Sequence, residues 1–206
     1  MKYSFFSLLI SFILFSAHSY AQPKNISQKS DKHIFIDVHY LPDGKVSFKD
    51  VAAAHAKDLA VEQKYGVEFI KYWVDESKGV VYCLSTASDT AHIRQTHAEA
   101  HGLLPQQIFE VSDGLEAKSQ KAGTYFIDVH SLGEGNVTAA DVAKAHEKDL
   151  AEQKKYGANF INYWVDEKKG VVICLSQAKN SSDVIETHKA AHGLIPKYIQ
   201  AVKQGQ

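Results

Sequence analysis

Two short segments of the chain carry the same pair of histidines. Residues 96–105 read THAEAHGLLP, and residues 187–196 read THKAAHGLIP. In each segment the imidazoles are four residues apart, so on a helix they share one face. Neutral imidazole is a common metal ligand, and nitrogen-rich sites suit zinc, copper, nickel or iron better than magnesium or calcium. An isolated HxxxH pair also occurs as a polar contact in helical cores, so the spacing alone leaves both interpretations open.

The chain around these segments is duplicated. A shift of 91 residues aligns 34–111 with 125–202 without a gap, and 44 of the 78 aligned positions are identical. Residues 88–95 share nothing with 179–186, yet the two histidines that follow agree. Eight of the 11 histidines recur in this way and are the candidate metal ligands: His39, His55, His97, His101, His130, His146, His188 and His192.

The N-terminus indicates export. Lys2 precedes an apolar stretch from Phe5 to Phe15, and Ser19 and Ala21 occupy the small-residue positions of a cleavage site. We therefore expect a signal peptide at 1–21, with an uncleaved anchor as the alternative. The mature protein would start at about Gln22, be periplasmic or secreted, and have no membrane association once the signal is removed.

The composition of residues 22–206 indicates a polar lead and two domains joined by a linker. Residues 22–32 form a polar lead that we expect to be disordered, and residues 112–123, SDGLEAKSQKAG, are a polar linker between the copies. The two predicted domains are therefore 33–111 and 124–203. The net charge is −1 and no cluster of lysine or arginine stands out, which argues against nucleic acid as a partner.

Each copy has the pattern of a β-α-β-β-α-β unit. Ser47 and Asp50, like Thr138 and Asp141, have the spacing of a helix capping box. Gly66 and Gly102 follow the two helical segments, as glycine often does at helix ends. The expected elements are strands at 34–38, 67–74, 79–85 and 107–111, and helices up to residue 65 and over 88–101. This order predicts an α+β chain of two tandem ferredoxin-like domains.

Both helices would cover one face of each four-stranded sheet and leave the other face bare. Successive side chains of a strand point to opposite faces, so two sets of residues could lie on the bare face. One set is Phe35, Phe69, Trp73 and Val81, and the other is Ile34, Ile36, Ile70 and Val74. Either set is too apolar to face water. We therefore expect the two sheets to pack against each other, as an internal pseudo-dimer in the form of an α/β barrel.

This topology brings the histidines to one end of each domain. His39 ends the first strand, His55 lies on the first helix, and His97 and His101 lie in the last turns of the second helix. Four imidazoles should therefore converge in each copy. Asp58, and Asp149 in the other copy, could add a carboxylate.

A second polar group involves the first and third strands. Asp37 and His39 share one strand face, and Cys83 could point the same way; the counterparts are Asp128, His130 and Cys174. A thiolate there would favour a soft or borderline metal. The cysteines could instead be small buried hydrophobes, or Cys83 and Cys174 could pair across the sheets.

The pattern FIDVH…DVAxAHxxDL…KYGxxFIxYWVDExxGVVxCL…THxxAHGLxP resembles a small bacterial ferredoxin-like family that is described as nickel-binding. It covers essentially all of both repeats. The resemblance implies the split βαβ fold, a dimer-like pairing of domains, and a bound transition metal, nickel first, with zinc or copper possible. Only the matched histidines are carried over as candidate ligands.

Three functions are compatible with these features. The first is an exported, non-catalytic metal-binding protein with one histidine cluster per repeat. The second is a metal-dependent or oxygenase-like enzyme of the dimeric α/β barrel type, which an open coordination position beside a pocket would favour. The third is a ligand- or protein-binding module with structural histidines. The sequence identifies no catalytic residue, and the motifs GxSxG, CxxC and HExxH are absent.

Overall fold

The computed structural model describes residues 32–114, 116–120 and 122–206. The expected signal peptide, residues 1–21, lies outside the described residues, as does the expected lead 22–32 apart from its last residue. No helix in the described part of the chain combines the length and the apolar character that crossing a membrane requires.

Both repeats contain the predicted β-α-β-β-α-β order. The first consists of β1 (His33–Tyr40), α1 (Phe48–Val61), a 3₁₀ turn η1 (Glu62–Tyr65), β2 (Glu68–Asp75), β3 (Val80–Ala87), α2 (Thr90–Ala100) and β4 (Gln107–Asp113). The second consists of β5 (Thr124–Ser131), α3 (Ala139–Tyr156), β6 (Asn159–Asp166), β7 (Val171–Ala178), α4 (Ser181–Ala191) and β8 (Tyr198–Gly205).

The predicted capping boxes begin the longer helix of each repeat. The Ser47 hydroxyl accepts a hydrogen bond from the Asp50 backbone N–H, and the Asp50 carboxylate accepts one from the Ser47 backbone N–H. Thr138 and Asp141 do the same at α3. Glu76, in the turn after β2, accepts the N–H of Phe48. The β2–β3 hairpin therefore fixes where α1 starts, which in turn positions the side chains that α1 carries.

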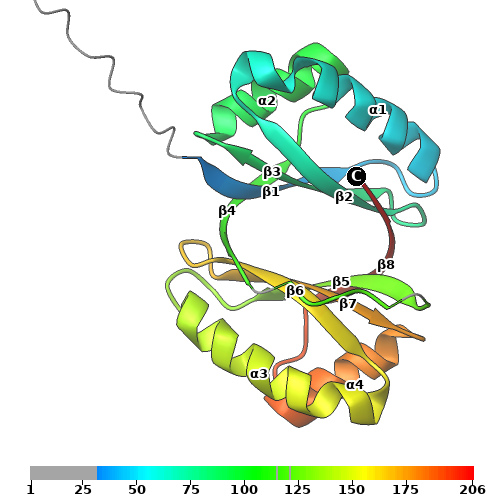
Figure 1. Cartoon of the computed structure of the whole chain (residues 1–206), viewed down its shortest axis with the longest axis vertical. Helices are drawn as coiled ribbons and strands as arrows, with labels where there is room; N and C mark the ends of the chain where they lie inside the picture. Colours follow the sequence, from blue (N-terminus) through cyan, green and yellow to red (C-terminus); the bar gives the residue numbers. More distant parts are fainter. Residues whose placement is uncertain (1–31, 115, 121) are drawn as a thin grey trace, which may run out of the picture.

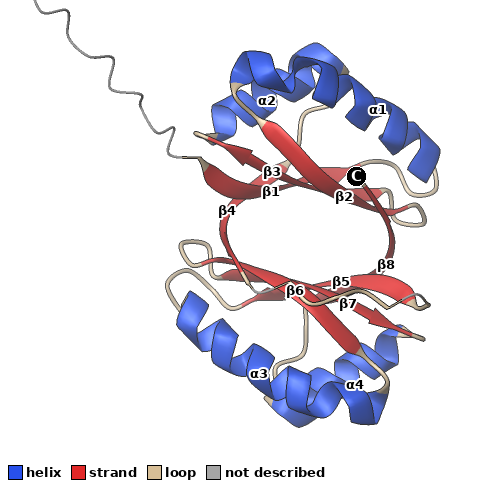
Figure 2. Ribbon diagram, in the orientation of Figure 1, coloured by secondary structure: helices blue, strands red, loops and turns tan. Residues whose placement is uncertain are grey.

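The eight strands form one closed antiparallel barrel in the order β1-β3-β2-β8-β5-β7-β6-β4. The last strand of each repeat closes it, because β4 pairs with β1 and then, through Ser112 and Asp113, with β6. Likewise β8 pairs with β5 and, through its last residues, with β2. The predicted pseudo-dimeric barrel is confirmed, with α1 and α2 on one outer face and α3 and α4 on the opposite one (Figures 1 and 2).

The inner faces of the two sheets form one shared core. Trp73 and Trp164 meet there with ring centroids 5.3 Å apart, beside Ile36 and its counterpart Ile127. The faces predicted from strict alternation are wrong for the second strand. A β-bulge after Phe69 adds a residue to β2, so Phe69 packs under the helices while Trp73 faces the barrel.

Two glycines allow the barrel to close. Gly205 is the last residue of β8 and pairs with Tyr72 of β2, and a Cβ at this position would lie 2.1 Å from Cζ of Tyr72. Gly114, its counterpart, would place a Cβ 2.6 Å from Cε1 of Tyr163. Tyr72 is buried, with 3% of its surface exposed, so its ring has little room to move. Each closing strand therefore ends against a tyrosine ring of the other repeat.

We expect Gly205→Ala to lower the free energy of unfolding by about 1–3 kcal/mol, because the added methyl group overpacks a filled site. Denaturant unfolding followed by circular dichroism measures the change, with Gln206→Ala, at the next residue, as the matched control. An unchanged midpoint for Gly205→Ala would show that β8 does not need this close approach.

Candidate metal centre

Strand β1 carries the first two polar groups of the site. Its alternation turns Asp37 and His39 toward the helices, while Ile36 and Val38 face the barrel. Asp37 has no exposed surface, and its Oδ1 lies 3.0 Å from Nε2 of His39. Cys83 is the register partner of Asp37 on β3, and the three residues present ligand atoms within 4.8 Å of one another.

The helices supply a second group above the sheet. His97 lies in the last turn of α2, and His101 is the C-terminal cap of that helix. Asp58 on α1 approaches both, with Oδ1 3.0 Å from Nδ1 of His97 and 3.2 Å from Nε2 of His101. The other ring nitrogen of His97, Nε2, lies 3.4 Å from Oδ1 of Asp37. A buried imidazole is therefore held between one carboxylate of the sheet and one of the neighbouring helix.

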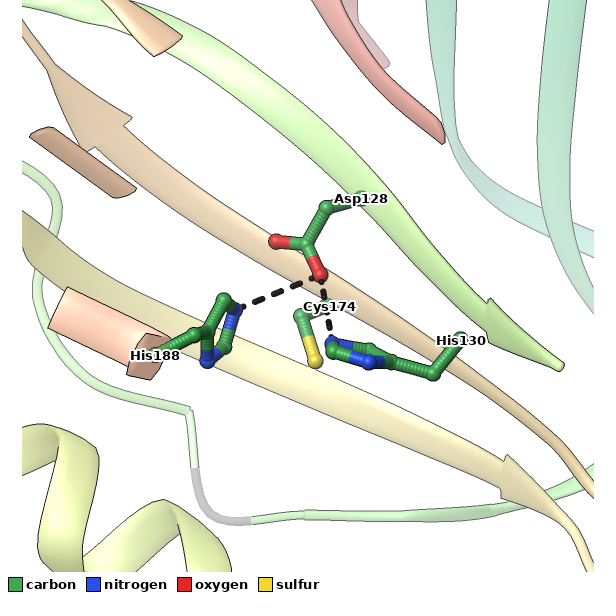
Figure 3. A group of neighbouring side chains, drawn as sticks. All are labelled: Asp128, His130, Cys174 and His188. Atoms are coloured by element: carbon green, nitrogen blue, oxygen red, sulfur yellow. Dashed lines mark ion pairs between the residues drawn. The ribbon is translucent and has the colours of Figure 1, made fainter. Parts of the chain in front are cut away.

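The second repeat reproduces this arrangement. Asp128 Oδ1 lies 3.2 Å from Nε2 of His130 and 3.4 Å from Nε2 of His188, and the Cys174 side chain stands between the two rings (Figure 3). All four ligand atoms lie within 4.8 Å of one another, and all four residues are buried. On the far side of His188, Nδ1 lies 3.0 Å from Asp149. His192 lies 3.3 Å from the same carboxylate oxygen.

Several of these atoms lack hydrogen bonds. Both oxygens of Asp37 and Nε2 of His97 are buried without a hydrogen-bond partner among the described residues, and so are the matching atoms of Asp128 and His188. The distances are short, but the angles do not meet hydrogen-bond geometry, so these atoms converge as close charge pairs and not as hydrogen-bonded ones. Ligands of one ion, about 2.0–2.3 Å from it, lie roughly 2.9–3.7 Å apart. The spacing of these atoms therefore suits a shared metal ion.

The negative charge of the site is partly compensated before any ion binds. Burial raises the pKa of Asp37, but His39 and His97 outweigh that effect and bring the pKa below its ordinary value. Burial lowers the pKa of His97, and the carboxylates of Asp37 and Asp58 more than compensate and raise this pKa to about 9. His188 is raised to about 9 for the same reason. Without metal, the imidazole between the two carboxylates is therefore protonated at neutral pH.

The cysteines remain thiols in this environment. Burial, together with the charges of Asp37 and Asp58, raises the pKa of Cys83 well above its usual value, and Cys174 behaves likewise. The alternative of a Cys83–Cys174 disulfide is wrong, because both cysteines are free. Each sulfur faces the helices of its own repeat, on opposite outer sides of the barrel, so the closed barrel separates them.

The structure brings three of the four predicted histidines of each repeat together. Ring centroids of His39 and His97 are 4.9 Å apart, and those of His97 and His101 are 5.1 Å apart. His55 lies to one side, with its ring 4.7 Å from that of Tyr72, and burial lowers its pKa. His146 has the same position against Tyr163. Neither belongs to the groups of close ligand atoms found among the described residues.

Asp37 and Asp128 join the site although histidine counting alone does not select them. The signal is the D-x-H spacing on one strand, which puts the carboxylate and the imidazole on one face. Asp58 and Asp149 come from the adjacent helix, one turn after His55 and His146. A small, mostly apolar cavity borders each group, with a volume of about 100 Å³ in the first repeat and about 190 Å³ in the second.

Comparison with known proteins assigns both repeats to one family. Residues 35–111 and 126–202 each match the family described as nickel-responsive and SCO4226-like. Among solved structures, SCO4226 from Streptomyces coelicolor A3(2) is similar, with 30% identity over 40% of this chain and 99% of that chain, and a TM-score of 0.37. A mutant chlorite dismutase from Candidatus Nitrospira defluvii is 9% identical over 84% of this chain and 91% of that chain, with a TM-score of 0.46.

No curated protein matches the chain. The family match nevertheless covers both repeats over almost their whole length, including every residue of the two polar groups. The chain therefore belongs to the SCO4226-like family of nickel-responsive proteins.

Proposed function

We propose that the protein is an exported transition-metal-binding protein that holds one nickel ion in each repeat. The ligands in the first repeat are Asp37, His39, Cys83 and Nε2 of His97. In the second they are Asp128, His130, Cys174 and Nε2 of His188. The observation that carries the proposal is the set of buried oxygen and nitrogen atoms that have no hydrogen-bond partner and point toward one centre.

His97 could bind an ion through either ring nitrogen, and the surroundings favour Nε2. Its Nδ1 already has a partner in Asp58, which His101 also contacts, whereas Nε2 has none. Metal-bound imidazoles commonly donate their other N–H to a carboxylate, which fixes the orientation of the ring. Asp58 and His101 would then support the ligand set from outside. The sequence predicts His55 and His101 as ligands as well. In this proposal they lie beside the four ligands and do not bind the ion.

The donor chemistry supports a borderline or soft ion. Two imidazoles, one thiolate and one carboxylate suit nickel, zinc or copper and do not suit magnesium or calcium, which prefer oxygen. The family description favours nickel among these. The cavity beside each set leads to the histidines and offers a path by which an ion could enter.

We expect the mature chain to bind two nickel ions and the His97→Ala variant to bind one. The double variant with His188→Ala should bind none, because both ligand sets then lack a central imidazole. Elemental mass spectrometry of untagged protein, equilibrated with nickel and desalted, gives the stoichiometry.

His92→Ala is the matched control, since His92 lies on the same helix and bonds to Ser88, outside the site. His55→Ala should retain both ions. Full nickel content in the double variant, or a wild type that holds no transition metal, would contradict the proposal.

Nickel binding near pH 8 should release about two protons per ion. One comes from the Cys83 or Cys174 thiol and one from the His97 or His188 ring, both of which are protonated in the metal-free protein. Because these protons must leave, affinity should rise with pH up to about 9, by roughly 100-fold per unit. Calorimetry in buffers of different ionisation enthalpy counts the protons.

A Cys83→Ser, Cys174→Ser variant isolates the contribution of the thiols. It should release about one proton per ion, because only the imidazole then loses one. Equal proton release from this variant and the wild type would mean that sulfur does not bind the ion.

Export can be tested separately. Expression of the full chain in a Gram-negative host should yield a periplasmic protein that begins at Gln22, as read by N-terminal sequencing. Ala21→Leu should leave the signal attached, because the cleavage site requires a small residue there. A wild-type product that keeps residues 1–21 would contradict export by this route.

A further inference from the structure

A separate cavity opens at one end of the barrel. Its volume is about 610 Å³, within the range typical of small-molecule sites. The barrel core forms its floor through Val38, Val129, Tyr82 and Ile173. Val38 and His39 are neighbours on β1, but they face opposite sides of the sheet. The cavity is therefore distinct from the metal-ligand groups, which lie under the helices.

The rim of this cavity is positively charged. Arg94, Lys169 and Lys197 line it, and among the described residues that line it none is acidic. Arg94 donates one hydrogen bond to the Pro105 carbonyl, and neither Arg94 nor Lys197 has an ion pair within the described part of the chain. The Lys169 ammonium lies 4.8 Å from the centre of the Phe109 ring and 3.8 Å from Asp166. At least two cations are thus free to bind an anionic group.

Aromatic side chains complete the wall. Tyr40 and Tyr198 are 47% and 45% exposed at the rim, and Tyr82 is buried below them. The Tyr82 hydroxyl donates to Oε1 of Gln200 at 2.5 Å, which fixes the ring. A second cavity shares these three tyrosines and is lined by two acidic residues, Asp43 and Asp75, and one basic residue, Lys78, whereas the first cavity has only basic charged residues in its lining.

The two repeats diverge at this mouth and agree at the metal-ligand groups. Asp37, His39, Asp58, Cys83 and His97 are each identical to their counterparts 91 residues later. Five pairs of equivalent residues have both members in the cavity lining. Val38 and Val129 are identical, and the repeats differ at the other four pairs: Tyr40/Ser131, Tyr82/Ile173, Gln106/Lys197 and Gln107/Tyr198. Arg94 corresponds to Ile185. Because the strand order repeats after a half turn around the barrel, both members of each of these cavity pairs reach the same mouth.

We propose that this mouth is a binding site for one small organic anion with an aromatic or other apolar body. The apolar part lies on the core floor between the tyrosines, and the acidic group meets Arg94 and Lys197. The unlike pairs make the site asymmetric, so that it distinguishes the two ends of such a ligand although the barrel around it is built from two copies of one unit.

Naphthalene-2-carboxylate is the probe, and its uncharged amide is the matched ligand control. Isothermal titration calorimetry with the mature protein should show one carboxylate site per chain and at least tenfold weaker binding of the amide. The variants Arg94→Ile and Lys197→Gln replace each cation by the residue found at the equivalent position of the other repeat. Each should raise the dissociation constant about tenfold, as expected for the loss of one charge-assisted contact.

Lys168→Gln is the protein control, because Lys168 neighbours Lys169 but pairs with Glu110 outside the cavity. The variants should keep the two nickel ions, so failure here is distinguishable from failure of the metal proposal. The inference is overturned if wild type does not bind the carboxylate at millimolar concentration, if the amide binds equally, or if the double variant Arg94→Ile, Lys197→Gln binds as tightly as wild type.

Discussion

The pairing of β4 and β8 with strands of the other repeat is the constraint on which the molecule depends. A ferredoxin-like unit buries only one face of its sheet under its helices, and here the other face carries Ile36, Trp73 and Leu84. Closure places this face in a shared core and leaves the described barrel without an open sheet edge. The residues that permit closure, Gly114 and Gly205, have tyrosine rings of the other repeat against them. Neither repeat therefore completes its own structure alone.

A rigid barrel allows each repeat to bury charge beside its helices. Asp37 is fully buried, and a carboxylate in that position is costly unless it is compensated. Two imidazoles provide the compensation, and Asp58 in turn balances His97. The metal-free protein can therefore keep its ligand atoms assembled, because protons occupy the positions that an ion would take. In the proposed function an ion replaces these protons, and the atoms that would bind it already lie close together.

Strand β1 links the two functional proposals. Its odd-numbered residues Asp37 and His39 face the helices, and its even-numbered residues Val38 and Tyr40 face the barrel and its mouth. Duplication produced two equal metal-ligand groups on opposite outer faces, but only one barrel interior. Each repeat contributes part of the lining of the barrel mouth. A substitution in one repeat therefore changes only that repeat's part of the lining. This explains how a symmetric scaffold can carry a single asymmetric cavity.

The sequence alone predicts the order of elements, the duplication and the capping boxes, because these features rest on local spacing and on a strong internal repeat. It also predicts that His39, His97 and His101 lie close together. Side-chain direction across the sheets does not follow from the sequence. The bulge after Phe69 reverses the faces of β2, and only the register of β1 with β3 puts Cys83 opposite Asp37. His55 shares a helix with Asp58, yet it packs on Tyr72, because the rotation of α1 against the sheet is a property of the packed core. Local chemistry thus determined which residues could bind a metal, and tertiary packing decided which of their atoms meet.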